Sequence, residues 1–108
     1  MAAAVARDAN RLRRMLHRSV ELTVDGGGNV QAPRSPLSGA HQVGAHLGVV
    51  LFDPAVSLAV ASVNGMPGIV VRRKGEVVGV LSLQVRGRLV VRAWLVANPD
   101  KLGSWSAR

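Results

Sequence analysis

The sequence contains no cysteine and no tyrosine, and it has only one phenylalanine and two tryptophans among its 108 residues. Without cysteine the chain can form no disulfide, no thiolate zinc site and no cysteine nucleophile. A small domain without disulfides is typical of a reducing cytoplasm. Because aromatic rings are so few, the core must be built from valine, leucine, alanine and isoleucine, and platforms for stacking nucleic-acid bases are scarce.

Long apolar runs are also missing. No stretch approaches the roughly 20 apolar residues of a membrane span, and residues 1–16 lack the uninterrupted apolar segment of a signal peptide. We therefore expect a soluble cytoplasmic protein without membrane attachment. Apolar residues make up 48% and charged residues 19% of the sequence, a globular composition. The length predicts a single domain over residues 1–108.

Acidic residues are scarce: six stand against 14 basic ones, which gives a formal net charge of +8. This balance favours a polyanionic partner. The alternative is an ordinary surface that uses arginine in place of lysine. A row of arginines at helical spacing could meet phosphates, but we expect it to be a solvated face and nucleic acid not to be the partner. The row consists of Arg7, Arg11, Arg14 and Arg18.

The first half of the sequence shows helical periodicity interrupted by one strand. Apolar positions recur at steps of three and four over residues 2–18, which predicts an amphipathic helix. Residues 20–24 alternate as a short strand. Residues 30–38 carry two prolines and predict a loop or an irregular edge strand. A second helix is expected over residues 38–51, capped by Ser38 and weakened by three internal glycines.

From Pro54 onward the apolar period changes from 3.6 to two. Glycine-containing turns then separate four stretches of alternating residues, which predicts a four-strand antiparallel meander followed by a C-terminal tail over residues 97–108. A helix, a strand, a helix and then a run of strands is an α+β plan. The four strands are expected over residues 55–63, 68–73, 76–85 and 88–96.

Two-residue loops at Lys74-Gly75 and Arg86-Gly87 would assign every strand residue to a face. The helix side would then carry Ile69, Val71, Val78, Val80, Leu89, Val91, Ala93 and Leu95. The opposite face is apolar too, whereas an antiparallel sheet normally keeps one face polar. An apolar patch of this kind argues for a second copy or a partner, although a β-bulge would exchange the faces. The expected dimer or partner surface is Leu81, Leu83, Val90, Arg92 and Trp94.

Two short motifs carry a family resemblance. The first is Asp25-Gly26-Gly27-Gly28 after the first strand, and the second is Asn98-Pro99-Asp100-Lys101-Leu102 after the last. With the intervening segment VNGMPGIVVRRKGEVVGVLSLQV, they resemble the SnoaL-like group of the nuclear transport factor 2-like superfamily. The resemblance is to the C-terminal extension of sigma-J-like extracytoplasmic-function sigma factors, and it runs from about Ala3 to Trp105. It implies a cone-like curved sheet packed on N-terminal helices.

The resemblance also implies a role. In that group the extension modulates the sigma factor by contacting its core-binding and promoter-reading parts, and both motifs are implied to be interaction or switch elements. We expect a homodimer or a domain docked on a sigma factor or RNA polymerase component. No promoter-reading helical module precedes the domain, so we expect a stand-alone relative, a split partner or an excised domain. The structural alternative is that the first motif only reverses the chain and the second only starts a helix.

Other members of the superfamily are isomerases, cyclases and hydrolases that work inside the cone. Such chemistry needs a carboxylate desolvated in an apolar pocket, and Asp25 and Asp53 are weak candidates for one. Glu76 is expected to pair with Arg73 instead. Because no tyrosine is present for an isomerase-type oxyanion hole, we lean towards a protein that is not an enzyme. A protein or enzyme that uses the cone cavity for a small hydrophobic ligand remains the alternative.

Metal and cofactor sites are not expected. His41 and His46 are five residues apart, which places them about 140° apart around a helix rather than on one face. We expect them to be surface or partly buried side chains. The three consecutive glycines lack the lysine and serine or threonine of a phosphate loop and the spacing of a dinucleotide fingerprint.

Overall fold

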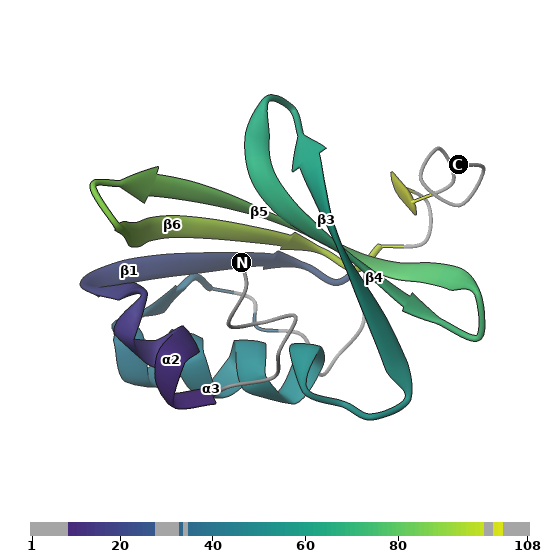
Figure 1. The fold of residues 1–108 in the computed structure, drawn as a ribbon, viewed down its shortest axis with the longest axis horizontal. Coiled ribbons are helices and arrows are strands. Elements are labelled where there is room, and N and C mark those ends of the chain that lie inside the picture. Colours follow the sequence, from purple (N-terminus) through teal and green to yellow (C-terminus); the bar gives the residue numbers. More distant parts are fainter. Residues whose placement is uncertain (1–8, 28–32, 34, 99–100, 103–108) are drawn as a thin grey trace.

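The computed structural model of the chain describes residues 9–27, 33, 35–98 and 101–102. A curved, open sheet of six strands lies over the helices, which occupy one side of it (Figure 1). Within the described part, no helix is both long and apolar enough to cross a membrane. The elements in chain order are α2 (Ala9–Arg14), β1 (Leu16–Asp25), β2 (Leu37–Ser38), α3 (Ala40–Leu51), β3 (Val56–Val63), β4 (Met66–Arg73), β5 (Glu76–Arg86) and β6 (Leu89–Val96).

The strand order across the sheet is β2-β1-β6-β5-β4-β3. Strands β3 to β6 form an antiparallel meander, which confirms the predicted run of four strands and the α+β class. Strand β1 instead pairs with β6 in parallel, and Asp25 lies beside Val96 at the end of this pair. The sheet is therefore mixed rather than wholly antiparallel. Because β1 and β6 run in the same direction, their C-terminal ends lie at the same end of the sheet.

The N-terminal helix is shorter than predicted among the described residues. It ends at Arg14, and residues 16–18 belong to β1. Leu16 and Val20 are buried and four apart, a spacing that fits a strand as well as a helix. The predicted arginine row is broken for the same reason, because Arg18 lies on β1 and Arg7 lies outside the described residues. The start of the predicted helix, residues 2–8, lies outside them too.

Helix α3 confirms most of the second predicted helix. Val43, Leu47 and Leu51 are buried against the sheet, and a fully buried leucine stabilises a fold by roughly 1.5–3 kcal/mol. The predicted cap is wrong. Ser38 belongs to the two-residue strand β2, where it pairs with Glu21. The helix instead begins after Gly39, at φ 90° and without a side-chain cap.

The hairpin turns explain the register of the meander. Asn64-Gly65 and Lys74-Gly75 each have positive φ at both loop positions, the conformation that a tight hairpin with this twist requires. The third loop is Gly87-Arg88 rather than Arg86-Gly87, because Arg86 pairs with Leu89. In addition, the register shifts between Val71 and Arg72 on β4 and between Gln84 and Val85 on β5.

These shifts exchange part of the predicted faces. Leu81, Leu83 and Val90 pack in the main core beneath the helices, so their assignment to an outer partner surface is wrong. Conversely, Val78 is 37% exposed and Val80 packs in a second cluster. The predicted helix-side residues that do lie in the main core are Ile69, Val71, Ala93 and Leu95.

A smaller apolar cluster lies apart from the main core. It joins Val63, Val70, Val77 and Val80 of the meander to Leu102. Val70 and Val77, which are not among the predicted helix-side residues, are therefore buried here by the chain's own residues. From the predicted partner surface, Arg92 remains exposed and Trp94 half-buried.

Candidate functional site

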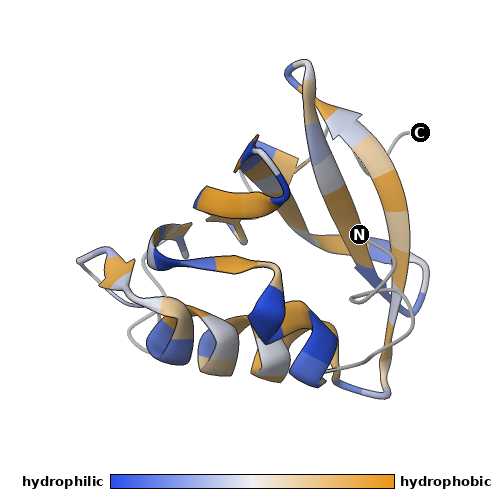
Figure 2. Ribbon diagram, turned by 60° about the vertical axis from the view of Figure 1, so that its left-hand side comes forward, coloured by the Kyte–Doolittle hydropathy of each residue, from blue (hydrophilic) through white to orange (hydrophobic). Residues whose placement is uncertain are grey.

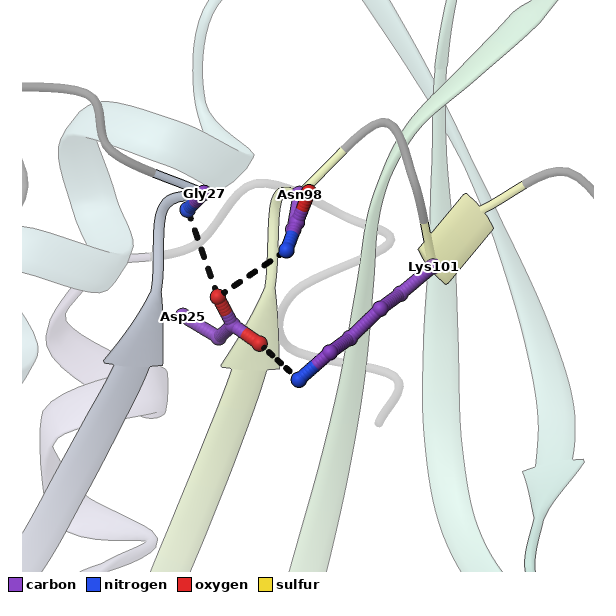
Figure 3. A network of polar contacts seen from close by, with 4 residues as sticks. All are labelled: Asp25, Gly27, Asn98 and Lys101. Atoms are coloured by element: carbon purple, nitrogen blue, oxygen red, sulfur yellow. Dashed lines mark hydrogen bonds and ion pairs between the residues drawn. The ribbon is translucent and has the colours of Figure 1, made fainter.

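The two sequence motifs meet in space. Asp25 ends β1, and Asn98 follows β6 by two residues. Because these strands are parallel neighbours, their C-terminal ends lie side by side. The amide of Ala97 donates to the carbonyl of Asp25 at 2.8 Å. Figure 3 shows the resulting group, here called the motif junction: Asp25, Gly27, Asn98 and Lys101.

The carboxylate of Asp25 is the centre of the motif junction. Its Oδ2 accepts from Nζ of Lys101 at 2.6 Å, and its Oδ1 accepts from the amide of Gly27 at 3.2 Å and from Nδ2 of Asn98 at 3.5 Å. The hydrogen bond from Lys101 is the largest cause of a lowered pKa for Asp25; partial desolvation opposes it, and Gly27 and Asn98 add to it. The group is therefore held as a carboxylate.

Gly27 fits the motif junction only without a side chain. Its φ is +62°, and a Cβ placed there would lie 2.6 Å from Oδ1 and 3.1 Å from Cα of Asn98. Both the left-handed backbone and the close approach therefore require glycine. The first motif does more than reverse the chain, since its third residue makes room for the second motif.

The remaining motif residues are placed only in part. Gly26 is half-buried in the turn after β1. Leu102 is buried and packs on the second apolar cluster, and the amide of Lys101 donates to the carbonyl of Asn98 at 2.9 Å. The second motif thus fixes the chain at two points, one polar and one apolar. Gly28, Pro99 and Asp100 lie outside the described residues.

Asp53 occupies a different place, in the loop between α3 and β3. Its Oδ2 accepts from Nη2 of Arg73 at 2.6 Å and its Oδ1 accepts from the amide of Ala55 at 2.8 Å. The sequence assigned Arg73 to Glu76. These two do lie opposite each other in the register, but the guanidinium forms its ion pair with Asp53. The two-residue loop Asn64-Gly65 signals this contact, because it places Val56, three residues after Asp53, opposite Arg73.

Asp53 and Arg73 line a pocket of about 320 Å³ with a valine-rich wall. A second pocket of about 360 Å³ lies on the outer face beside Trp94, Lys101 and Leu102. The interior between α2, α3 and the sheet is nearly filled, since the pocket among its leucines measures only about 20 Å³. Of these three pockets among the described residues, the two larger ones lie outside the centre of the cone.

The histidines are placed as the sequence predicts. His41 is exposed and His46 half-buried on α3, and burial lowers the pKa of His46. Among the described residues, no three histidine, aspartate or glutamate side chains lie close enough together to hold a metal ion.

Comparisons with known proteins place this geometry in a wider context. Neither a scan of protein-family models nor a comparison with curated proteins finds a match. Among solved structures, the extracytoplasmic function sigma factor SigJ of Mycobacterium tuberculosis is 31% identical over 94% of this chain, with a TM-score of 0.62. The chain spans 40% of the length of that sigma factor.

Other similar structures have lower sequence identity. A SnoaL-like protein of unknown function from Burkholderia thailandensis is 21% identical, with a TM-score of 0.60 over 87% of this chain and 83% of its own. A steroid delta-isomerase from Pseudomonas aeruginosa is 20% identical, with a TM-score of 0.63 over 99% of this chain and 82% of its own. The chain therefore has the nuclear transport factor 2-like fold. Within that fold it is similar in sequence as well as in structure to part of a sigma factor, and similar in structure to a SnoaL-like protein.

Proposed function

We propose that this domain is a non-enzymatic regulatory module that acts in transcription through contacts with an extracytoplasmic-function sigma factor, in the cytoplasm and as a homodimer or docked on that factor. The motif junction carries the proposal. Two segments that resemble paired signatures of a sigma factor extension bind each other through Asp25 and Lys101. The 31% identity to a sigma factor over 94% of this chain supports the same role.

The motif junction has the chemistry of an exchangeable contact. The side chains of Lys101 and Asp25 are 62% and 33% exposed, so neither charge would be left buried and unpaired if the other were drawn away. A cation or a carboxylate of a partner can therefore replace one member at little cost. Such an exchange would release the segment after β6 from the end of β1, which gives the junction two arrangements between which a partner can select.

Two further observations argue against catalysis in the cone. A carboxylate acts as a general base at neutral pH when its pKa is raised, whereas that of Asp25 is lowered by its contact with Lys101. Ligand sites usually enclose about 300–1,000 Å³, whereas the pocket among the central leucines measures about 20 Å³.

The proposal is tested by exchanging domains. The segment of the Mycobacterium tuberculosis sigma factor that matches this chain is replaced by this chain, and promoter-dependent transcription is measured in vitro beside the full-length and truncated factors. We expect the chimaera to behave like the full-length factor. Asp25→Asn within the chimaera should shift it towards the truncated factor, because the motif junction loses its central charge.

Glu76→Gln is the matched control. It also removes one carboxylate, but from the exposed β4–β5 hairpin, and it should leave transcription by the chimaera unchanged. A chimaera that behaves like the truncated factor contradicts the proposal. Equal effects of the two substitutions would contradict the role of the motif junction.

The pocket at Asp53 favours a second candidate, the binding of a small hydrophobic ligand. Its volume of about 320 Å³ is at the lower end of the usual range for ligand sites. A steroid ketone is the probe, because a steroid delta-isomerase shares the fold. Binding should raise the unfolding temperature, and Asp53→Asn should reduce the rise. No change at the solubility limit of the steroid, with no isomerisation, contradicts this candidate for that ligand class.

A further inference from the structure

Strand β3 forms an open edge of the sheet. It pairs with β4 through eight consecutive residue pairs without a register shift, and no described strand lies on its other side. In an antiparallel pair, alternate residues direct their backbone groups away from the partner strand. At the opposite edge, β2 is only two residues long. The described sheet therefore has one short edge and one long one.

The sequence of β3 contains none of the features that usually prevent an edge strand from pairing with another chain. Exposed edge strands are normally guarded by charged side chains, proline or a bulge, but β3 has the sequence VSLAVASV. Among the described strands longer than two residues, it alone carries no charged or histidine side chain. Val60 near its centre is 59% exposed. In Figure 2 this outermost strand has no strongly hydrophilic colour along its length.

Charge indicates which partner fits. Two copies of a chain with net charge +8 repel each other, and the repulsion is smallest where they meet through uncharged residues. Strand β3 offers uncharged residues over its whole length, and the arginines beside it, Arg72 and Arg73 of β4, lie opposite its first two residues only. When identical strands pair antiparallel about a two-fold axis, each meets its own sequence. The side chains of Ser57, Ala59 and Ser62 are small and exposed, so they allow a second sheet edge to approach, while Val60 loses water on pairing.

We propose that β3 is a self-association edge, at which two copies pair their β3 strands antiparallel and join two six-stranded sheets into one. This deepens the dimer part of the proposed function by naming its surface, and it does not require contact with a sigma factor. It also replaces the predicted partner surface, whose Leu81, Leu83 and Val90 lie in the core.

The test measures molar mass by sedimentation equilibrium from low micromolar to submillimolar concentration. The unsubstituted chain should form a dimer. Val60→Lys should weaken the dimer by at least about tenfold, because like charges would then face each other across the axis. Hydrogen exchange should slow in β3 as concentration rises and stay constant in β2.

Val85→Lys is the matched control, since Val85 is 44% exposed and lies near the end of β5. It should leave the dimer intact, and thermal unfolding monitors the fold of both variants. A monomer at every concentration overturns the proposal, as does a dimer that Val60→Lys leaves unchanged. The domain-exchange assay separates this proposal from the transcriptional one. A chain that forms no dimer but supports transcription in the chimaera contradicts only the β3 proposal. A chain that dimerises through β3 but does not support transcription contradicts only the proposed sigma-factor contact.

Discussion

Nζ of Lys101 donates to Oδ2 of Asp25 at 2.6 Å across a sequence separation of 76 residues. The contact joins the segment after β6 to the end of β1. These two parallel strands end side by side. Both side chains are partly exposed, and exposed ion pairs contribute little to global stability. The consequence of this pair is therefore local: it holds the second motif against the first.

Lys101→Met should loosen this attachment without unfolding the domain. The unfolding temperature is expected to change little, because the main core does not include Lys101. The amide of Lys101, which donates to the carbonyl of Asn98, should exchange faster with solvent, as measured by NMR. Lys74→Met removes the other lysine of the sequence from the exposed β4–β5 turn and should leave that exchange rate unchanged. Equal rates in all three proteins would contradict the local role.

The attachment should also weaken in acid. The pKa of Asp25 in the folded chain lies below its ordinary value of 3.8, chiefly because Lys101 donates to the carboxylate. The unfolded chain therefore takes up this proton first as the pH falls, and the contribution is complete above about 3.8 and lost as the pH falls through the folded value. Titration of the Asp25 carboxyl carbon by NMR should give a midpoint below 3.8 in the unsubstituted chain. Lys101→Met should raise that midpoint, and an unchanged one would contradict the assigned cause.

Gly27→Ala should be more damaging than the same substitution at Gly75. Both glycines have positive φ, +62° and +81°, but only at Gly27 would the new Cβ meet Asn98, whereas at Gly75 nothing lies within 4 Å. The backbone strain of about 1–2 kcal/mol is common to both, and overpacking adds roughly 1–3 kcal/mol at Gly27. Denaturant unfolding measures the difference. Adding Asn98→Ala should recover part of the loss at Gly27 and none at Gly75.

The sequence predicts the elements better than the way in which they meet. Lys74-Gly75 marks its hairpin correctly, since both loop residues take the positive φ that such pairs favour. The first loop is shorter than the predicted turn over residues 64–67, because Met66 and Pro67 already belong to β4 and only Asn64-Gly65 form the loop. The third loop was misplaced by one residue, because its only glycine takes the first loop position instead of the second. The register shift between Val71 and Arg72 leaves no trace in an apolar alternation. It puts Leu81 and Leu83 in the main core and Val80 in the second cluster, the reverse of the faces that unbroken alternation gives.

The candidate site was predictable only through resemblance. Nothing in the periodicity requires β1 to lie beside β6, so the meeting of Asp25 with Lys101 could not be derived from spacing. The ion pair of Asp53 with Arg73 was not predicted, because the hairpin register places Glu76 opposite Arg73. On the other side of β4, Val56 lies opposite Arg73, and Asp53, three residues before Val56, forms the ion pair with the guanidinium.

The corrected faces can be tested directly. Leu81→Ala should cost about 2–5 kcal/mol of unfolding free energy, the range for a leucine removed from a packed core, because Leu81 is 1% exposed in the main core. Val78→Ala should cost well under about 1.5 kcal/mol, because Val78 is 37% exposed and less transfer free energy is lost. Urea unfolding of both variants supplies the comparison. A larger loss of unfolding free energy for Val78→Ala than for Leu81→Ala would support the faces predicted from unbroken alternation instead.

Acid should act on the domain through His46 as well. Burial on α3 lowers the pKa of this histidine from its ordinary value of 6.5, so the unfolded chain binds its proton at a higher pH than the folded chain does. Stability should therefore fall as the pH decreases below 6.5, until the folded value is passed. His46→Gln should flatten the dependence of urea unfolding on pH in this window, whereas His41→Gln, at an exposed position on the same helix, should leave it unchanged. If His46→Gln keeps the full slope while His41→Gln removes it, the burial of His46 is not its cause.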